Sequence, residues 1–243
     1  MMATGAAREE LRLRGNGELT DDLLRGLNWS AFMLESLILA LDWFGICVFA
    51  VSGALVASRK QMDIVGFAML GTVTGIGGGT IRDVLLGVQP IFWMAQPNYL
   101  LACVAVACAT FFFAHVPQHR YRYLLWFDAV GLALFAVTGA GAALAHGASP
   151  SIAVAMGVAT ATFGGIIRDI LGGESPIILS QEIYITAALA GATVYVALVG
   201  MGVSQDLALV TGFVAGFGLR SAALYWGLTL PRYKPKAGRG DDQ

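Results

Sequence analysis

The chain has 243 residues, of which 57% are apolar and only 13% are charged, and its mean hydropathy is +0.70. Soluble domains carry about 25% charged residues, so this composition predicts an integral membrane protein. The net charge of −1, with no basic patch, argues against nucleic acid as a partner. The three cysteines do not have the spacing of metal ligands, so neither a metal nor a cofactor is expected.

The N-terminal segment 1–32 mixes acidic and basic side chains and lacks the apolar core of a secretory signal, so we interpret it as a soluble charged tail. A membrane span needs about 20 mostly apolar residues. Seven stretches meet this requirement: 36–57, 64–89, 98–115, 123–145, 151–175, 183–203 and 207–230. The expected fold is therefore an all-α integral membrane protein with seven transmembrane helices.

Lysine and arginine residues collect at one set of span ends, including Arg59, Lys60 and the basic tail 232–243. Positively charged loops stay on the cytoplasmic side. The pattern predicts a multi-pass protein of the plasma (inner) membrane with its N-terminus outside and its C-terminus in the cytoplasm.

An internal repeat appears when the sequence is shifted by 86 positions. DWFGICVFAVSGALVA from Asp42 matches DAVGLALFAVTGAGAA from Asp128 at eight of sixteen positions, and GGTIRDVLLGVQPI from Gly78 matches GGIIRDILGGESPI from Gly164 at nine of fourteen. Each copy holds three spans, so the second copy enters the membrane from the opposite face. The predicted organisation is a first three-helix repeat (33–118), a second, inverted repeat (119–204) and a seventh helix (205–231).

Glycines interrupt the second and fifth spans at Gly77, Gly78 and Gly79, and again at Gly164 and Gly165. The stretch before the first run is too short to cross a hydrocarbon core of about 30 Å, so the glycines lie within the membrane. Consecutive glycines permit a kink or an unwound turn. The alternative is that they allow two helices to pack closely.

Charged residues follow the glycines in both copies, as Arg82–Asp83 and Arg168–Asp169, and Asp42 and Asp128 lie early in the first and fourth spans. Intramembrane charges cost about 2.5–3.5 kcal/mol each on insertion scales, which favours a functional role. Locking helices together is the structural alternative. Further candidates are the matched hydroxyls Ser52 and Thr138, and Arg220, which either reaches the interface or pairs with a carboxylate.

At GGGTIRD, FGGIIRD, the paired FAVSGA and FAVTGA, and LRSAALYWGLTLP, the chain resembles the prokaryotic branch of the trimeric intracellular cation channels. This branch is also catalogued as small membrane proteins with suggested glycine transport. The resemblance covers about residues 36–231. It implies a homotrimer in lipid with one pore per subunit, lined by kinked second and fifth helices and passing K⁺ and also Na⁺. The pore candidates are then Gly77, Gly78, Gly79, Arg82, Asp83, Gly164, Gly165, Arg168 and Asp169, with Ser52 and Thr138 as weaker ones.

Two functions remain open at this stage. The first is a potassium-permeable channel, in which Arg82 or Arg168 gates by pairing and unpairing with a carboxylate. The second is a transporter of glycine or another small zwitterion, in which arginine holds a carboxylate and aspartate an ammonium. An enzyme is not expected, because no catalytic triad or metal cluster appears in the spans.

Overall fold

A computed structural model describes residues 39–113, 120–177 and 183–229. The chain divides into two compact units, Met1–Ala40 and Leu41–Gln243. The predicted tails 1–32 and 232–243 lie outside the described residues.

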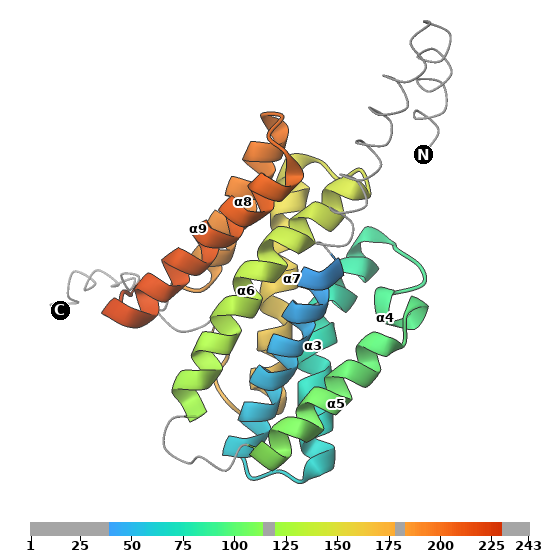
Figure 1. The fold of residues 1–243 in the computed structure, drawn as a ribbon, viewed down its shortest axis with the longest axis vertical. Coiled ribbons are helices and arrows are strands. Elements are labelled where there is room, and N and C mark those ends of the chain that lie inside the picture. The colour runs from blue at the N-terminus through green and yellow to red at the C-terminus, as the bar shows by residue number, and fades with distance from the viewer. Residues whose placement is uncertain (1–38, 114–119, 178–182, 230–243) are drawn as a thin grey trace, which may run out of the picture. The chain divides into compact units, whose positions relative to one another are not determined.

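Every predicted span corresponds to a helix within the described part of the chain (Figure 1). Five of the helices are long and apolar enough to cross a membrane, and two apolar helices, α5 and α8, are shorter at 16 residues each. One further short helix, α4, was not predicted. The elements are a first helix Leu39–Arg59, α3 Ile64–Leu86, α4 Phe92–Ala95, α5 Asn98–Phe113, α6 Arg120–Ala145, α7 Pro150–Leu171, α8 Ile185–Gly200 and α9 Gln205–Trp226.

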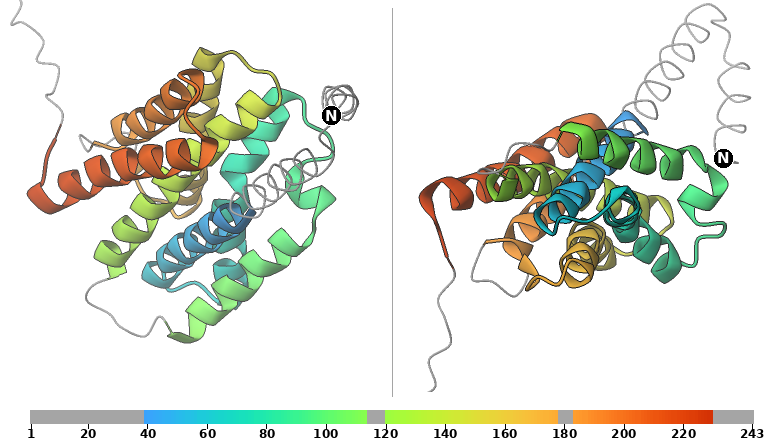
Figure 2. Two further views of the ribbon diagram at one scale, coloured as in Figure 1. Left: turned by 45° about the horizontal axis from the view of Figure 1, so that its top comes forward. Right: turned by 90° about the horizontal axis from the view of Figure 1, so that it is seen from below.

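The helices form a bundle in which α6 and α7 hold the central places (Figures 1 and 2). Helix α6 packs against α7, α8 and α9, while α3 packs against α5 on one side and α7 on the other. The α3–α7 contact therefore joins the two predicted repeats.

Equivalent positions of the two repeats form the same local structure. The N–H of Met62 donates to Ala57 O and that of Ala148 to Ala143 O, each at 3.0 Å. The residues in each of these pairs of bonds are 86 positions apart, so the sequence repeat is also a repeat of backbone conformation at these turns.

Helix α3 ends earlier than predicted, at Leu86 instead of residue 89, because Gly87 adopts a left-handed conformation with φ of 69°. Helix α7 likewise ends at Leu171 instead of residue 175. In both cases a glycine follows immediately and closes the last turn with bonds to preceding carbonyls.

The glycine runs lie where α3 and α7 cross. A Cβ atom built on Gly78 would stand 2.0 Å from Thr160 O, and one on Gly164 would stand 2.5 Å from Thr74 O. Both helices are continuous through their glycines, so neither contains an unwound turn. Close backbone packing, the alternative role, is therefore realised at these two positions, while a kink remains a prediction.

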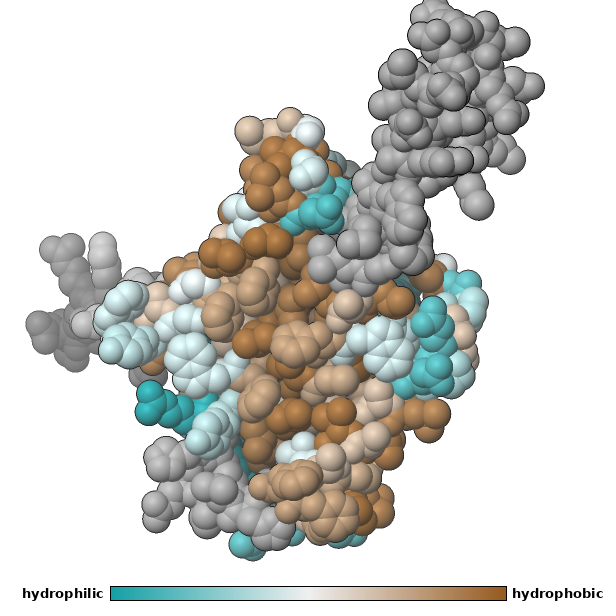
Figure 3. All heavy atoms as spheres, viewed as in Figure 1, coloured by the Kyte–Doolittle hydropathy of each residue, from teal (hydrophilic) through white to brown (hydrophobic). Residues whose placement is uncertain are grey.

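Apolar side chains dominate the visible face of the bundle, and hydrophilic ones gather toward its margins (Figure 3). Large exposed apolar residues include Val65, Leu101 and Val214. A water-soluble protein rarely exposes so continuous an apolar surface, so this face is built to contact lipid or another subunit.

Candidate functional site

The first candidate cluster lies at the end of α3. Asp83 Oδ1 accepts hydrogen bonds from Arg82 Nε at 2.9 Å and pairs with Arg82 Nη2 at 2.8 Å. The other oxygen, Oδ2, accepts the backbone N–H of Phe92 at 2.9 Å. Asp83 is buried. Its bond to Phe92 ties α4 to the end of α3, and its charge offsets that of Arg82.

The second cluster lies at the end of α7 and is sealed from solvent. Arg168 Nε donates to Asp169 Oδ1 at 2.8 Å, and Nη1 donates to Asp128 Oδ1 at 2.6 Å and to Ser52 Oγ at 2.5 Å. Asp169 Oδ2 accepts the backbone N–H of Ile177 at 3.0 Å. One guanidinium thus joins the first helix, α6 and α7.

The two clusters share their local geometry but differ in exposure. The side chain of Arg82 is 13% exposed, whereas those of Arg168 and Asp128 are both 0% exposed. The repeat would give Arg82 the partners Asp42 and Thr138, in place of Asp128 and Ser52. No hydrogen bond from Arg82 to Asp42 or Thr138 is found among the described residues. The first cluster is therefore open where the second is closed.

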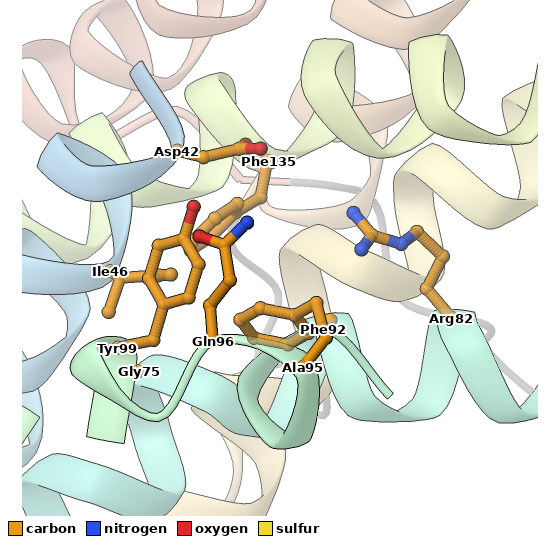
Figure 4. Close-up of a pocket in the computed structure, with 10 residues that line it drawn as sticks. Asp42, Ile46, Gly75, Arg82, Phe92, Ala95, Gln96, Tyr99 and Phe135 are labelled. Carbon is orange, nitrogen blue, oxygen red and sulfur yellow. The ribbon is translucent and has the colours of Figure 1, made fainter. Parts of the chain in front are cut away.

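Helix α3 borders a cavity of about 140 Å³ at the open cluster (Figure 4). In Figure 4 the Arg82 guanidinium reaches into this space from one side, and Asp42, Gln96 and Tyr99 face it from the other. Asp42 Oδ1 is buried without a hydrogen-bond partner in the described structure, although the Thr138 hydroxyl lies beside the carboxyl group. The remaining lining comes from Ile46, Gly75, Gly79, Phe92, Ala95 and Phe135.

Aromatic rings form much of the cavity wall. Tyr99 stacks on Trp43 with ring centroids 4.3 Å apart and meets the Phe92 ring edge-on at 5.3 Å. The guanidinium of Arg82 lies over the Phe92 ring at 5.9 Å. A cavity with a carboxylate, a guanidinium and aromatic walls suits a cation or a small zwitterion.

Arg220 is fully buried within the bundle. Its Nη1 donates to Ile183 O at 3.2 Å, and its Cζ lies 5.1 Å from the centre of the Tyr184 ring. Tyr184 in turn approaches Gly165, where an added Cβ would stand 2.8 Å from the Tyr184 hydroxyl. Arg220 thereby supports the sealed cluster from α9, and its pairing with a carboxylate remains a prediction.

The structure brings together most of the predicted site residues, but in two groups. Ser52, Asp128, Arg168 and Asp169 form the sealed cluster, with Gly165 beside it. Asp42, Gly79 and Arg82 line the cavity, which Gly77 and Gly78 do not. Sequence reasoning missed Gln96, Tyr99, Phe92 and Tyr184. Their signal is weak, because aromatic and amide residues near span ends are ordinary interface residues.

Comparison with known proteins identifies the family. A family model described as "Glycine transporter" matches residues 39–115 and 125–200. An orthologue of the trimeric intracellular cation channel from Rhodobacter sphaeroides, solved by crystallography, is 66% identical, with a TM-score of 0.78 over 79% of this chain and 100% of that one.

The chain belongs to the trimeric intracellular cation channel family. A second solved member, a prokaryotic channel crystallised in 0.5 M KCl, is 34% identical with a TM-score of 0.75 and covers 81% of this chain and 100% of its own. The inner membrane protein YadS of Escherichia coli K12 is 41% identical over 81% of this chain and 96% of its own. A Vibrio cholerae membrane protein is also 41% identical, over 82% and 83% of the two chains. The solved relatives are ion channels, not enzymes.

Proposed function

We propose that the protein is a homotrimeric, potassium-permeable channel of the inner membrane, with one pore in each subunit. The observation that supports it most is the cavity beside Asp42: this intramembrane carboxylate, whose Oδ1 is buried without a hydrogen-bond partner among the described residues, lines a space inside an apolar helix bundle. Intramembrane carboxylates attract cations and are costly without a purpose. The solved relatives are cation channels, which agrees with this reading.

The proposed pathway runs from the Asp42 cavity along α3 and α7 toward the Arg168 cluster. Asp42, Asp83, Asp128 and Asp169 outnumber Arg82 and Arg168 by two formal charges, so the route favours cations over anions. The pathway is closed at the Arg168 cluster, because the side chains of Arg168 and Asp128 have no exposed surface. Passage requires Arg168 to leave Asp128 and Ser52.

Inverted symmetry is part of this proposal. The two three-helix repeats approach the membrane from opposite faces, and α9 stands outside them. Asp42 lies in the first turn of the first helix and Arg168 near the end of α7, so in this arrangement the open cavity faces outward and the sealed cluster faces the cytoplasm.

The test is single-channel recording in planar bilayers under a KCl gradient. Discrete current steps that reverse near the K⁺ equilibrium potential are expected. Asp42→Asn should lower conductance by up to about fivefold, because one charge in a hydrated cavity attracts a cation by about 1 kcal/mol at 4 Å. Asp206→Asn is the matched control, since Asp206 is an exposed carboxylate in the first turn of α9. Equal conductance in both variants would show that the cavity does not lie on the ion path.

Transport of a small zwitterion is the second candidate, because Asp42 and Arg82 face one another across a cavity of about 140 Å³. The carboxylate suits an ammonium group and the guanidinium a carboxylate. The family model's description agrees with this function. Proteoliposomes that lack single-channel currents but show saturable glycine counterflow, lost in both Asp42→Asn and Arg82→Gln, would favour the transporter over the channel.

A further inference from the structure

A group of salt bridges joins the end of the first helix to the segment after α7. Glu174 Oε2 lies 3.0 Å from Arg59 Nη1, and its Oε1 lies 3.8 Å from Lys60 Nζ. Lys60 Nζ also donates to Gly173 O at 3.5 Å. The Arg59 guanidinium lies 4.8 Å from the centre of the Tyr121 ring on α6. The two ion pairs of Glu174 are the Glu174 salt bridges. Together with the Arg59–Tyr121 contact they connect the first helix, the turn after α7 and α6.

The sequence repeat gives the Glu174 salt bridges no counterpart at the other end of the bundle. Shifting by the repeat interval of 86 replaces Arg59 and Lys60 with Ala145 and His146, and Glu174 with Val88. This trio cannot form ion pairs of the same kind, because one member is an alanine and another a valine. The two ends are therefore built differently even though the helices repeat.

The bridged end is also the end that is sealed. Glu174 N–H donates to Asp169 O at 2.8 Å, and Gly172 N–H donates to Arg168 O at 2.8 Å. Gly172 packs against Val56 so closely that an added Cβ would stand 2.6 Å from Val56 Cγ1. The turn that carries Glu174 is thus bonded to both charged residues of the α7 motif.

At the other end the equivalent turn has no ion-pair anchor among the described residues, although Val88 N–H donates to Asp83 O at 2.8 Å. There the equivalent arginine, Arg82, stays partly exposed beside a cavity. Presence of the salt bridges coincides with the sealed arginine, and their absence with the open one.

We propose that Glu174 is a positioning residue that keeps the Arg168 cluster closed by tying the α7 turn to Arg59 and Lys60. Loss of these bridges lets the turn move away from the first helix and breaks the hydrogen bond between Arg168 and Ser52. Closure of this end is a property of the fold, and only its effect on ion current rests on the function proposed above.

The test measures access to the protein beneath the turn. Val56, which is fully buried, is replaced by cysteine in a background where Cys47, Cys103 and Cys108 are changed to alanine. The labelling rate by a charged methanethiosulfonate reagent is then measured in nanodiscs, which expose both faces. Partly exposed ion pairs contribute at most about 1 kcal/mol each, so Glu174→Gln should speed labelling about two- to tenfold.

Two further variants separate the salt bridges from general loosening. Arg122→Gln removes an exposed charge beside Tyr121 and should leave labelling unchanged. Arg59→Gln with Lys60→Gln should speed labelling at least as much as Glu174→Gln, because it also removes the Lys60–Gly173 hydrogen bond and the Arg59–Tyr121 contact. Adding Glu174→Gln to that pair should add nothing, because both ion pairs are already lost. Raising salt from about 0.05 M to about 0.5 M should speed labelling of the parent protein but not of Glu174→Gln.

Labelling that is equally slow in the parent and in Glu174→Gln would overturn the proposal, as would equal acceleration by Arg122→Gln. Bilayer recordings of the same variants address the function separately. Faster labelling with a raised open probability supports both proposals. Faster labelling in a protein that passes no current supports the positioning role of Glu174 and contradicts the proposed channel function.

Discussion

Arg82 and Arg168 occupy the same place in the two repeats, yet their surroundings differ. Arg168 is fully buried and bonded to two carboxylates and a hydroxyl, whereas Arg82 is bonded to Asp83 and borders a cavity. A buried charge depends on its partners far more than a hydrated one does. The two arginines should therefore respond differently to the same substitution.

Arg168→Met should lower the free energy of unfolding by about 3–5 kcal/mol, because it leaves Asp128 buried without its cation. Adding Asp128→Leu to that variant should recover part of the loss, since one uncompensated carboxylate is then removed while Asp169 still lacks its cation. Arg82→Met should lower stability less, because the Arg82 side chain is 13% exposed and borders a cavity. Denaturant unfolding in detergent measures all three. Equal losses in Arg82→Met and Arg168→Met would contradict the structural difference.

The residue types at both clusters were predictable from the sequence, but their partners were not. The repeat pairs Arg82 with Arg168 and Ser52 with Thr138. It does not show that Ser52 meets Arg168 across the two halves, because that contact depends on how the helices cross. The sequence also does not indicate the Glu174 salt bridges, because charged residues at span ends are expected at any membrane surface.

At the scale of the helices, the hydrophobic stretches placed the spans to within a few residues, because each is long and bounded by polar or proline residues. The glycine runs were ambiguous. Their sequence allowed either a break or a close crossing; the approach of Gly78 to Thr160 and of Gly164 to Thr74 shows the close crossing, and a kink stays a prediction. The short helix α4 lacks a periodic pattern that is long enough to predict.

Gly78→Ala should destabilise the bundle by about 1–3 kcal/mol or more, because its methyl group would meet the Thr160 carbonyl oxygen at 2.0 Å. Gly218→Ala in α9 is the matched control: it is also a helix glycine, but nothing lies within 4 Å of an added Cβ. That change should be neutral or stabilising by up to about 1 kcal/mol. Thermal unfolding in detergent compares them, and a Gly78→Ala protein as stable as its parent would contradict the tight crossing.

At the scale of the whole molecule, composition alone predicted a membrane protein, and the helical bundle and its relatives agree. Trimer formation is expected from the resemblance to the family and not from any periodicity in this sequence. Orientation depends on the distribution of lysine and arginine.

Orientation can be tested with reporter fusions. A fluorescent protein fused after residue 243 should fluoresce, because this end is predicted to lie in the cytoplasm, whereas alkaline phosphatase fused there should be inactive. The same pair fused to the N-terminus should give the opposite result. Active phosphatase at the C-terminus would reverse the orientation and place the Asp42 cavity on the cytoplasmic side.

The difference between the two ends has an electrical consequence. One end presents a cavity lined by Asp42 and Arg82, and the other is closed by a buried guanidinium and tied by Glu174. Ions that enter from opposite sides meet these features in reverse order. Trimers inserted in a single orientation should therefore rectify, passing more current at one polarity than at the equal and opposite voltage.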